Sequence, residues 1–247
     1  MNLVGSLRLA LDSPLALEEQ PGEAELSLRI SEEPLGEPGP LVLQRLGAEL
    51  HVRGDGLRGV IGEARGELFA SGGPQATLAA LRLAVAVWLL PRGGLLLHGA
   101  CVESRGAAHV FLGESGAGKT TLARSLQSGA GETTLARGLR DARVIHDEVT
   151  CIRDGRVFGH PFASRAGDGR TPMEGLPLAS VSFLRHAART ERSALGPAER
   201  ARRLLKRVFL PLKDAHSLSL ALRAVALVDV PAFELKLRLG DAQAALP

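Results

Sequence analysis

The sequence contains no tyrosine, one tryptophan and seven phenylalanines among its 247 residues. A hydrophobic core must therefore be built from Leu, Val and Ala, and the sequence lacks the interleaved aromatic and basic residues that bind single-stranded nucleic acid. The formal net charge is only +3, which is too small to favour nucleic acid on electrostatic grounds. We therefore expect no nucleic-acid partner.

Cysteine is also scarce, with Cys101 and Cys151 the only two. They lack the spacing of a metal site or of a CxxC redox motif, so we expect both to be core residues. The longest strongly apolar run, Leu83 to Leu90, is too short to span a bilayer. Arg8 and Asp12 interrupt the first apolar stretch, which argues against a secretory signal. These observations predict a cytoplasmic protein with no membrane partner.

The first 93 residues (1–93) are predicted to form a small β-rich region that ends in a buried helix. Apolar and polar residues alternate over 7–11 and over 26–30, with the period of half-buried strands. Gly72-Gly73-Pro74 then opens a helix that runs to about Leu90. Its second half is apolar nearly all round, so we expect it to lie between two layers.

The remainder, residues 94–247, has the sequence pattern of an α/β domain. Short apolar runs at Leu95–Leu97, Val110–Leu112 and Arg143–Ile145 predict buried strands. Asp154-Gly155 indicates a hairpin, and the alternation from Phe233 to Leu239 predicts a closing strand.

An arginine-rich segment, roughly 177 to 208, is predicted to be helical. It carries eight basic residues and only Glu191 and Glu199 oppose them. Three interpretations stay open: a solvated helical face, one arginine that stabilises a phosphate, or docking of an acidic partner. The basic residues are Arg185, Arg189, Arg192, Arg200, Arg202, Arg203, Lys206 and Arg207.

Residues 113–120 read GESGAGKT and match the GxxxxGK[ST] phosphate-loop pattern completely. An apolar run precedes the loop and a helix-forming run follows it, as phosphate binding by backbone N–H groups at a helix N-terminus requires. The alternative is a chance glycine-rich turn before a helix. Lys119 is expected to reach the β and γ phosphates, and Thr120 to bind Mg²⁺. The predicted nucleotide site comprises Gly113, Glu114, Ser115, Gly116, Ala117, Gly118, Lys119, Thr120 and Thr121.

The phosphate loop is followed by a near copy of itself. Ser128 to Arg140 repeats Ser115 to Gln127 with ten of thirteen positions identical. Glu132 replaces the lysine and would repel a phosphate, so only the first copy is expected to bind nucleotide. The first helix either breaks near Ser128, because two glycines disfavour a helix interior, or continues through both copies. In either form we expect the insert to project outward.

A short acidic segment, His146-Asp147-Glu148, follows the predicted strand at 143–145. Carboxylates at a strand end beside a phosphate loop can hold Mg²⁺ or activate a nucleophile, although solvated acids at a strand end are the alternative. His98-Gly99 ends the strand before the loop strand in this interpretation. His98 would lie near the phosphates, orient the carboxylate, or serve only as a structural histidine.

Together these motifs resemble the HPr kinase/phosphorylase family, and more closely its diverged relatives, over roughly residues 94 to 239. The family pattern is an HG pair, a GxSGxGKS/T loop, an acidic pair, a GxP segment and a closing strand. Here the corresponding residues are His98-Gly99, Gly113 to Thr120, Asp147-Glu148, Gly159-His160-Pro161-Phe162, and Val230-Pro231 before the last strand.

The resemblance implies an α/β fold with a mixed-sheet P-loop kinase core, similar to HPr kinase and phosphoenolpyruvate carboxykinase. It implies a kinase that uses ATP and Mg²⁺ and phosphorylates a serine of a protein or precursor peptide. Asp147 would be the catalytic base, with Lys119 and His98 beside it, and Glu148 would join Thr120 at the metal, where the family usually has aspartate.

Two other functions stay open, namely a nucleotide-binding regulatory module without transfer activity and a small-molecule kinase. The substrate and a homo-oligomeric state are also left open.

Overall fold

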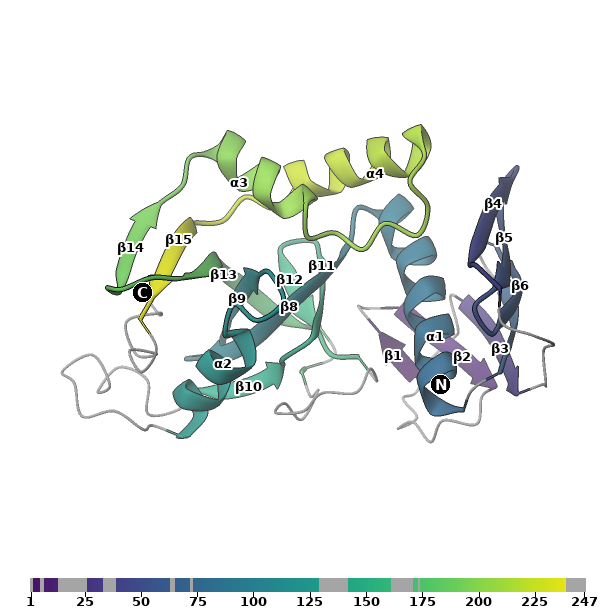
Figure 1. The fold of residues 1–247 in the computed structure, drawn as a ribbon, viewed down its shortest axis with the longest axis horizontal. Helices are drawn as coiled ribbons and strands as arrows, with labels where there is room; N and C mark the ends of the chain where they lie inside the picture. The colour runs from purple at the N-terminus through teal and green to yellow at the C-terminus, as the bar shows by residue number, and fades with distance from the viewer. Residues whose placement is uncertain are drawn as a thin grey trace.

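The computed structural model describes residues 2–4, 7–12, 26–32, 39–62, 65–71, 73–128, 142–160, 171–172 and 174–238. Two mixed β-sheets flank a central helix, α1, and three further helices cover the larger sheet (Figure 1). The chain is therefore an α/β protein, as its sequence predicts.

The N-terminal part forms a sheet of seven strands in the order β1-β2-β3-β7-β6-β5-β4. The parallel pairs are β2 with β3 and β3 with β7, and the other pairs are antiparallel. The predicted strands at 7–11 and 26–30 are confirmed as β2 and β3. The strands are β1 (Asn2–Val4), β2 (Leu7–Asp12), β3 (Leu26–Glu32), β4 (Val42–Leu46), β5 (Glu49–Gly54), β6 (Leu57–Ile61) and β7 (Arg65–Ala70).

Helix α1 (Pro74–Leu89) is the predicted buried helix, with Pro74 in its first turn, and a 3₁₀ turn, η1 (Leu90–Arg92), extends it. It packs on β3, β6 and β7 of the first sheet and on β8 of the second. By length and composition, Pro74–Arg92 could cross a membrane, a correction to the shorter run seen in the sequence. Most of this segment is buried inside the protein, as in the core helix of a soluble domain.

The second sheet contains eight strands, in the order β10-β8-β11-β12-β13-β15-β14, with β9 between β8 and β13. Strands β9, β13 and β15 are parallel, so their carboxyl ends share one edge. The strands are β8 (Leu95–Ser104), β9 (Ala107–Gly113), β10 (Arg143–His146), β11 (Val149–Arg153), β12 (Arg156–Phe158), β13 (Leu176–His186), β14 (Glu191–Ala194) and β15 (Ala232–Leu237).

Helices cover both faces of this sheet (Figure 1). Helix α2 (Lys119–Ser128) packs against β8, β9 and β10, and its Leu122 and Leu126 enter an apolar cluster with Phe111. On the other face, α3 (Pro197–Leu205) and α4 (Ala215–Ala226) pack against each other and cover a second cluster. The strand that ends in the phosphate loop is therefore buried on both sides.

Several local predictions are confirmed. The hairpin turn at Asp154-Gly155 joins β11 and β12, and both residues have positive φ, at 51° and 67°. Cys101 and Cys151 are free and fully buried. Burial raises the pKa of both thiols, as expected of inert core residues.

The prediction for the arginine-rich segment is wrong. The arginine-rich segment is not helical from 177 to 208, because its first half forms β13 and β14 and only Pro197–Leu205 is a helix. The apolar side chains of β13 point into the core, and Val181 is fully buried. The near copy of the loop, and with it the expected break and outward projection, lies almost wholly outside the described residues, as does Leu239 of the closing strand.

Candidate functional site

The loop between β9 and α2 has the predicted strand–loop–helix arrangement. Strand β9 ends at Gly113 and α2 begins at Lys119. Gly116 and Gly118 have φ of 78° and 87°, a conformation that glycine adopts without steric cost. A Cβ on Gly113 would lie 2.9 Å from the Ala117 Cβ, so glycine is also needed where the loop folds back on itself.

The side chain of Lys119 is held by backbone carbonyls at the start of the phosphate loop. Its Nζ donates to the Gly113 carbonyl at 3.0 Å and to the Glu114 carbonyl at 2.9 Å, and the residue is only 7 % exposed. Burial, and secondly the nearby Arg207, lowers the pKa of Lys119. A bound phosphate would counteract both effects because it supplies negative charge. Thr120 and Thr121 follow in the first turn of α2, Thr120 partly buried and Thr121 exposed.

The acidic segment lies at the end of β10, as predicted, and β11 begins directly after it. Both strands pair with β8 on the same edge, with His146 opposite Cys101 and Val149 opposite His98. Asp147 and Glu148 therefore interrupt one long antiparallel pairing, and the Gly99 N–H donates to the Glu148 carbonyl at 3.0 Å.

Strand β8 connects this segment to the phosphate loop. On its other edge β8 pairs with β9, with Gly99 opposite Leu112, the residue before Gly113. Neighbouring strands lie about 5 Å apart, so the start of the loop and the acidic segment are about 10 Å apart. The sequence placed His98-Gly99 at a strand end, which is wrong, because β8 continues to Ser104.

His98 lies among charged groups from three elements. Burial, the charge of Lys119 and that of Arg207 lower its pKa, while Glu148 acts in the opposite direction. These interactions place the imidazole in one neighbourhood with the loop lysine and the acidic segment. His98 also takes part in a hydrogen bond with the Glu148 backbone, as a structural histidine would, and the three interpretations of His98 stay open as predictions.

The two carboxylates of the acidic segment have different environments. Asp147 is buried, with 2 % of its surface exposed. Glu148 is partly exposed, and its Oε2 accepts from Nη2 of Arg82 on α1 at 3.0 Å. Oxygen donors of this kind suit Mg²⁺, and Thr120 adds a hydroxyl. Glu148 would have to leave or share Arg82 to bind a metal. Within the described residues, no group of three or more His, Cys, Asp or Glu is placed to hold a metal ion by itself.

A stacked pair of buried histidines, His146 and His160, lies next to the acidic segment. The rings of His146 and His160 are 3.5 Å apart between centroids and 13° from parallel. His160 Nε2 lies 2.7 Å from the Val149 carbonyl, and burial lowers the pKa of His160 to about 4. Burial, and secondly the neighbouring His160, holds the pKa of His146 well below 6.5. Both imidazole rings are therefore uncharged at neutral pH.

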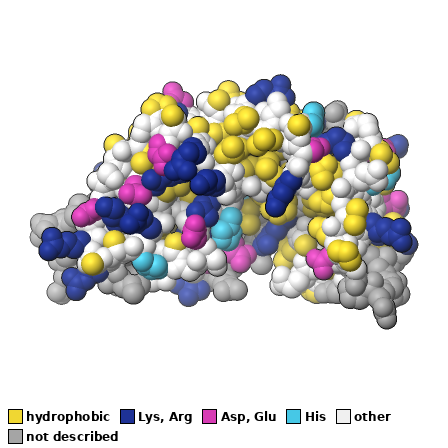
Figure 2. All heavy atoms as spheres, turned by 45° about the horizontal axis from the view of Figure 1, so that its top comes forward, with side chains coloured by type: hydrophobic (Ala, Val, Ile, Leu, Met, Phe, Trp, Pro, Cys, Tyr) yellow, Lys and Arg dark blue, Asp and Glu magenta, His cyan; other side chains and the backbone are white. Residues whose placement is uncertain are grey.

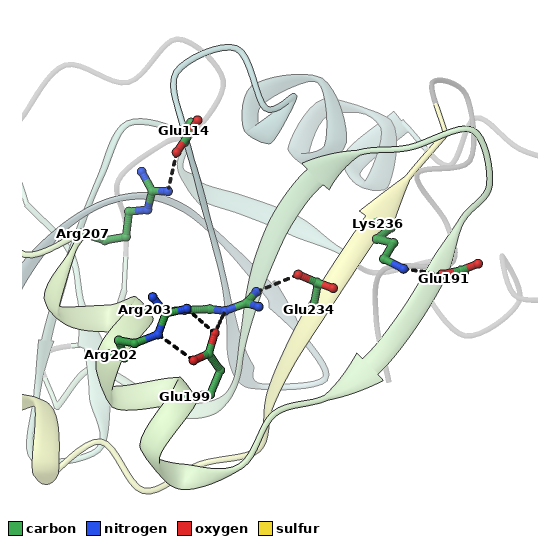
Figure 3. A network of polar contacts seen from close by, with 8 residues as sticks. All are labelled: Glu114, Glu191, Glu199, Arg202, Arg203, Arg207, Glu234 and Lys236. Atoms are coloured by element: carbon green, nitrogen blue, oxygen red, sulfur yellow. Dashed lines mark hydrogen bonds and ion pairs between the residues drawn. The ribbon is translucent and has the colours of Figure 1, made fainter.

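Two residues that sequence reasoning did not assign to the site also contact the loop. His186, at the end of β13, places Nε2 at 2.8 Å from the Gly116 carbonyl. Arg207, just after α3, places Nη2 at 3.6 Å from Oε1 of Glu114 (Figure 3). Arg207 was noted only as one member of a basic segment, and no local pattern marked it or His186, because each meets the loop from about 70 or more residues away.

A cleft of about 510 Å³ opens beside the loop, on the side of β13 and α3. Its volume lies within the usual range for ligand sites. Its lining residues are Gly113, Glu114, Ser115, Gly116, Ala117, Phe183, Leu184, Arg185, His186, Arg202, Arg203, Lys206, Arg207 and Glu234.

The basic segment is therefore divided between a strand, a helix and a turn, and five of its members line one cleft. These five residues do not form a single solvated helical face. Their arrangement fits the other two interpretations better, namely an arginine that stabilises a phosphate and docking of an acidic partner. Comparison with known proteins adds nothing to this geometry: no protein-family model matches the chain, and neither does any curated protein.

Proposed function

We propose that the protein is an ATP- and Mg²⁺-dependent kinase that transfers the γ-phosphoryl group to a serine hydroxyl of a protein or peptide. The observation that carries the proposal is the register of β8, which pairs on one edge with the strand that ends in the phosphate loop and on the other with the acidic segment. A phosphate-binding loop and a buried carboxylate about 10 Å apart are the two parts that phosphoryl transfer to a hydroxyl needs.

The loop would bind the nucleotide phosphates through its backbone N–H groups and the N-terminus of α2. Lys119 would exchange its two carbonyl partners for phosphate oxygens. Arg207 lies close enough to Lys119 to lower its pKa and is itself weakly held, at 3.6 Å from Glu114. It is therefore the arginine best placed to turn toward the charge that develops on the transferring group.

Asp147 would serve as the base. Its carboxylate would accept the serine hydroxyl proton while the serine oxygen forms a bond to the γ phosphorus. The bond from that phosphorus to the β–γ bridging oxygen would break, and ADP would leave with the electron pair. A bound Mg²⁺ would neutralise phosphate charge, with Thr120 and Glu148 as its protein ligands. A cytoplasmic location, which the proposal retains, would supply the ATP.

The Arg82–Glu148 ion pair favours a second candidate, a regulatory module that binds nucleotide without transferring phosphate. As it stands, the carboxylate expected at the metal is held by α1. The two candidates differ in whether label appears on the acceptor, so one experiment separates them.

The test uses purified protein, Mg²⁺, γ-labelled ATP and serine-containing peptides, with nucleotide affinity measured separately by calorimetry. Asp147→Asn keeps the shape of the side chain and removes its basicity, so transfer is expected to fall by about two orders of magnitude or more while ATP still binds. Lys119→Ala is expected to abolish or greatly weaken ATP binding. Lys213→Ala, an exposed lysine before α4, is the control. Unchanged ATP affinity in folded Lys119→Ala protein would refute the site, and full transfer in Asp147→Asn would refute the base.

A further inference from the structure

The cleft beside the phosphate loop carries an excess of positive charge. Five of its lining residues are Arg or Lys and two are glutamates, which leaves a net of three positive charges. Figure 2 shows Lys and Arg side chains gathered on this face over α3, with Asp and Glu side chains between them. Like charges held this close repel one another, so the cleft favours an anionic ligand.

Part of that charge is already neutralised inside the protein (Figure 3). Arg202 donates to both carboxylate oxygens of Glu199, and Arg203 lies between Glu199 and Glu234. These pairs fix the two guanidinium groups in place along α3. Arg202 and Arg203 line the cleft with their charge already paired to carboxylates.

The remaining cations are available. Arg207 is held only at 3.6 Å by Glu114, whose side chain is 85 % exposed. Arg185 and Lys206 are exposed, and within the described part of the chain neither forms a salt bridge. The hydrogen bond from Lys236 is the main cause that lowers the pKa of Glu191, and the charge of Arg185 is the last and smallest of the causes. Arg185 on β13 and Lys206 after α3 thus face one volume without a salt-bridge partner among the described residues, and Arg207 beside them is paired with Glu114 at 3.6 Å.

The nucleotide does not account for Arg185 and Lys206. Its phosphates have the loop backbone, the α2 N-terminus and Lys119, and neither Lys119 nor Asp147 lines the cleft. Its base is neutral and flat, and would need an apolar slot, whereas Ala117, Phe183 and Leu184 are the main apolar lining residues among many charged ones. Arg207 lies at the boundary, since it lines the cleft and also acts on Lys119.

We propose that the cleft binds an acidic segment of the acceptor peptide, whose carboxylates contact Arg185 and Lys206 and whose neighbouring serine is thereby brought to the phosphate loop. The description of the peptide as an acceptor rests on the proposed kinase function. The binding of an acidic peptide does not, because it needs neither nucleotide nor transfer. Carboxylates on adjacent residues can each meet one cation, so two or more acidic residues beside the serine are expected.

The test measures binding of fluorescent synthetic peptides by anisotropy, without nucleotide. One peptide has a single serine flanked by glutamates, and its matched partner has glutamines in their place. The glutamate peptide is expected to bind at least about tenfold tighter at low salt and to lose much of this preference as salt is raised. The double variant Arg185→Glu/Lys206→Glu should bind the glutamate peptide about tenfold or more weakly than the native protein does. The affinity of this variant for ATP should stay within about twofold of the native value.

The double reversal Lys213→Glu/Arg223→Glu, at two exposed positions outside the cleft, makes the same change in net charge, so it is the control and should leave peptide binding nearly unchanged. Equal binding of both peptides, or an equal loss in the control, would overturn the proposal. A parallel loss of ATP affinity in the double variant would assign the cleft to the nucleotide instead and would also overturn it. Charge-dependent peptide binding without transfer to any peptide would refute the kinase and leave the acidic-peptide site standing.

Discussion

The stacked pair of His146 and His160 should make the stability of the protein fall steeply below neutral pH. Burial lowers the pKa of His160 from 6.5 to about 4, and that of His146 is held well below 6.5. Above pH 6.5 the folded and the unfolded chains both carry neutral rings, so stability does not depend on these groups. Between pH 6.5 and 4 the unfolded chain binds protons that the folded chain does not, so stability is lost as the pH falls.

The size of the effect follows from the shift. A fall in pKa from 6.5 to about 4 corresponds to about 3 kcal/mol for His160, lost at up to about 1.4 kcal/mol per pH unit. Acidic side chains titrate mainly below pH 5, so the window from pH 7.5 to 5.5 reports on histidines. Other histidines with lowered pKa, His98 and His109, add to the slope of every variant alike.

A comparison of variants isolates the contribution of His160. His160→Phe retains a ring to stack on His146 but cannot take up a proton, and it loses the hydrogen bond to the Val149 carbonyl. It should be less stable by about 1 kcal/mol at pH 7.5 and should approach or overtake the native protein near pH 5.5.

Urea unfolding, followed by the fluorescence of the single tryptophan, Trp88, which is 1 % exposed, measures both curves. His216→Gln, which removes an exposed imidazole on α4, is the matched control and should follow the native curve. If the native protein and His160→Phe have the same slope between pH 7.5 and 5.5, His160 is not held neutral by the fold and the reasoning is wrong.

Three further predictions concern the N-cap of α4, a contact of the phosphate loop and the insert. Asp214 caps α4 and also binds Arg45 of β4 at 3.1 Å, so Asp214→Ala should lower stability by about 1 to 2 kcal/mol in urea unfolding, and no measurable loss would contradict the cap. His186→Ala removes the contact with the Gly116 carbonyl and should weaken ATP binding about fivefold by calorimetry, whereas unchanged affinity would show that the loop holds its shape alone. Deletion of residues 128–140 should leave a folded protein that still binds ATP, and a folded deletion variant without nucleotide affinity would place the insert in the site.

The sequence predicted those features of the site that are written in consecutive residues. The phosphate loop, its flanking strand and helix, and the hairpin at Asp154-Gly155 depend on local spacing and on glycine at positions of positive φ, and all are found where expected. His98 was recognised from its motif, but its place inside β8 was missed because the glycine that follows it was interpreted as the end of the strand.

Features that depend on pairing of distant segments could not be predicted. The Arg82–Glu148 ion pair joins residues 66 positions apart, and the His186–Gly116 contact joins residues 70 apart. The density of arginines near β13 was interpreted as a helix, although the buried face of that strand, with Val181 and Phe183, decides its structure. Charge reveals little about secondary structure when one face of an element is buried.

The position of α1 has a consequence for how the protein unfolds. One apolar cluster contains side chains of the first sheet, of α1 and of the second sheet, where Leu96, Val149 and Phe158 take part. A fragment that begins at Gly94 would keep the phosphate loop and the acidic segment but expose these side chains to water, at a cost that grows with the apolar area uncovered. The two sheets should therefore melt together in a single cooperative transition, and destabilising substitutions in the first sheet should lower the fraction of molecules able to bind nucleotide.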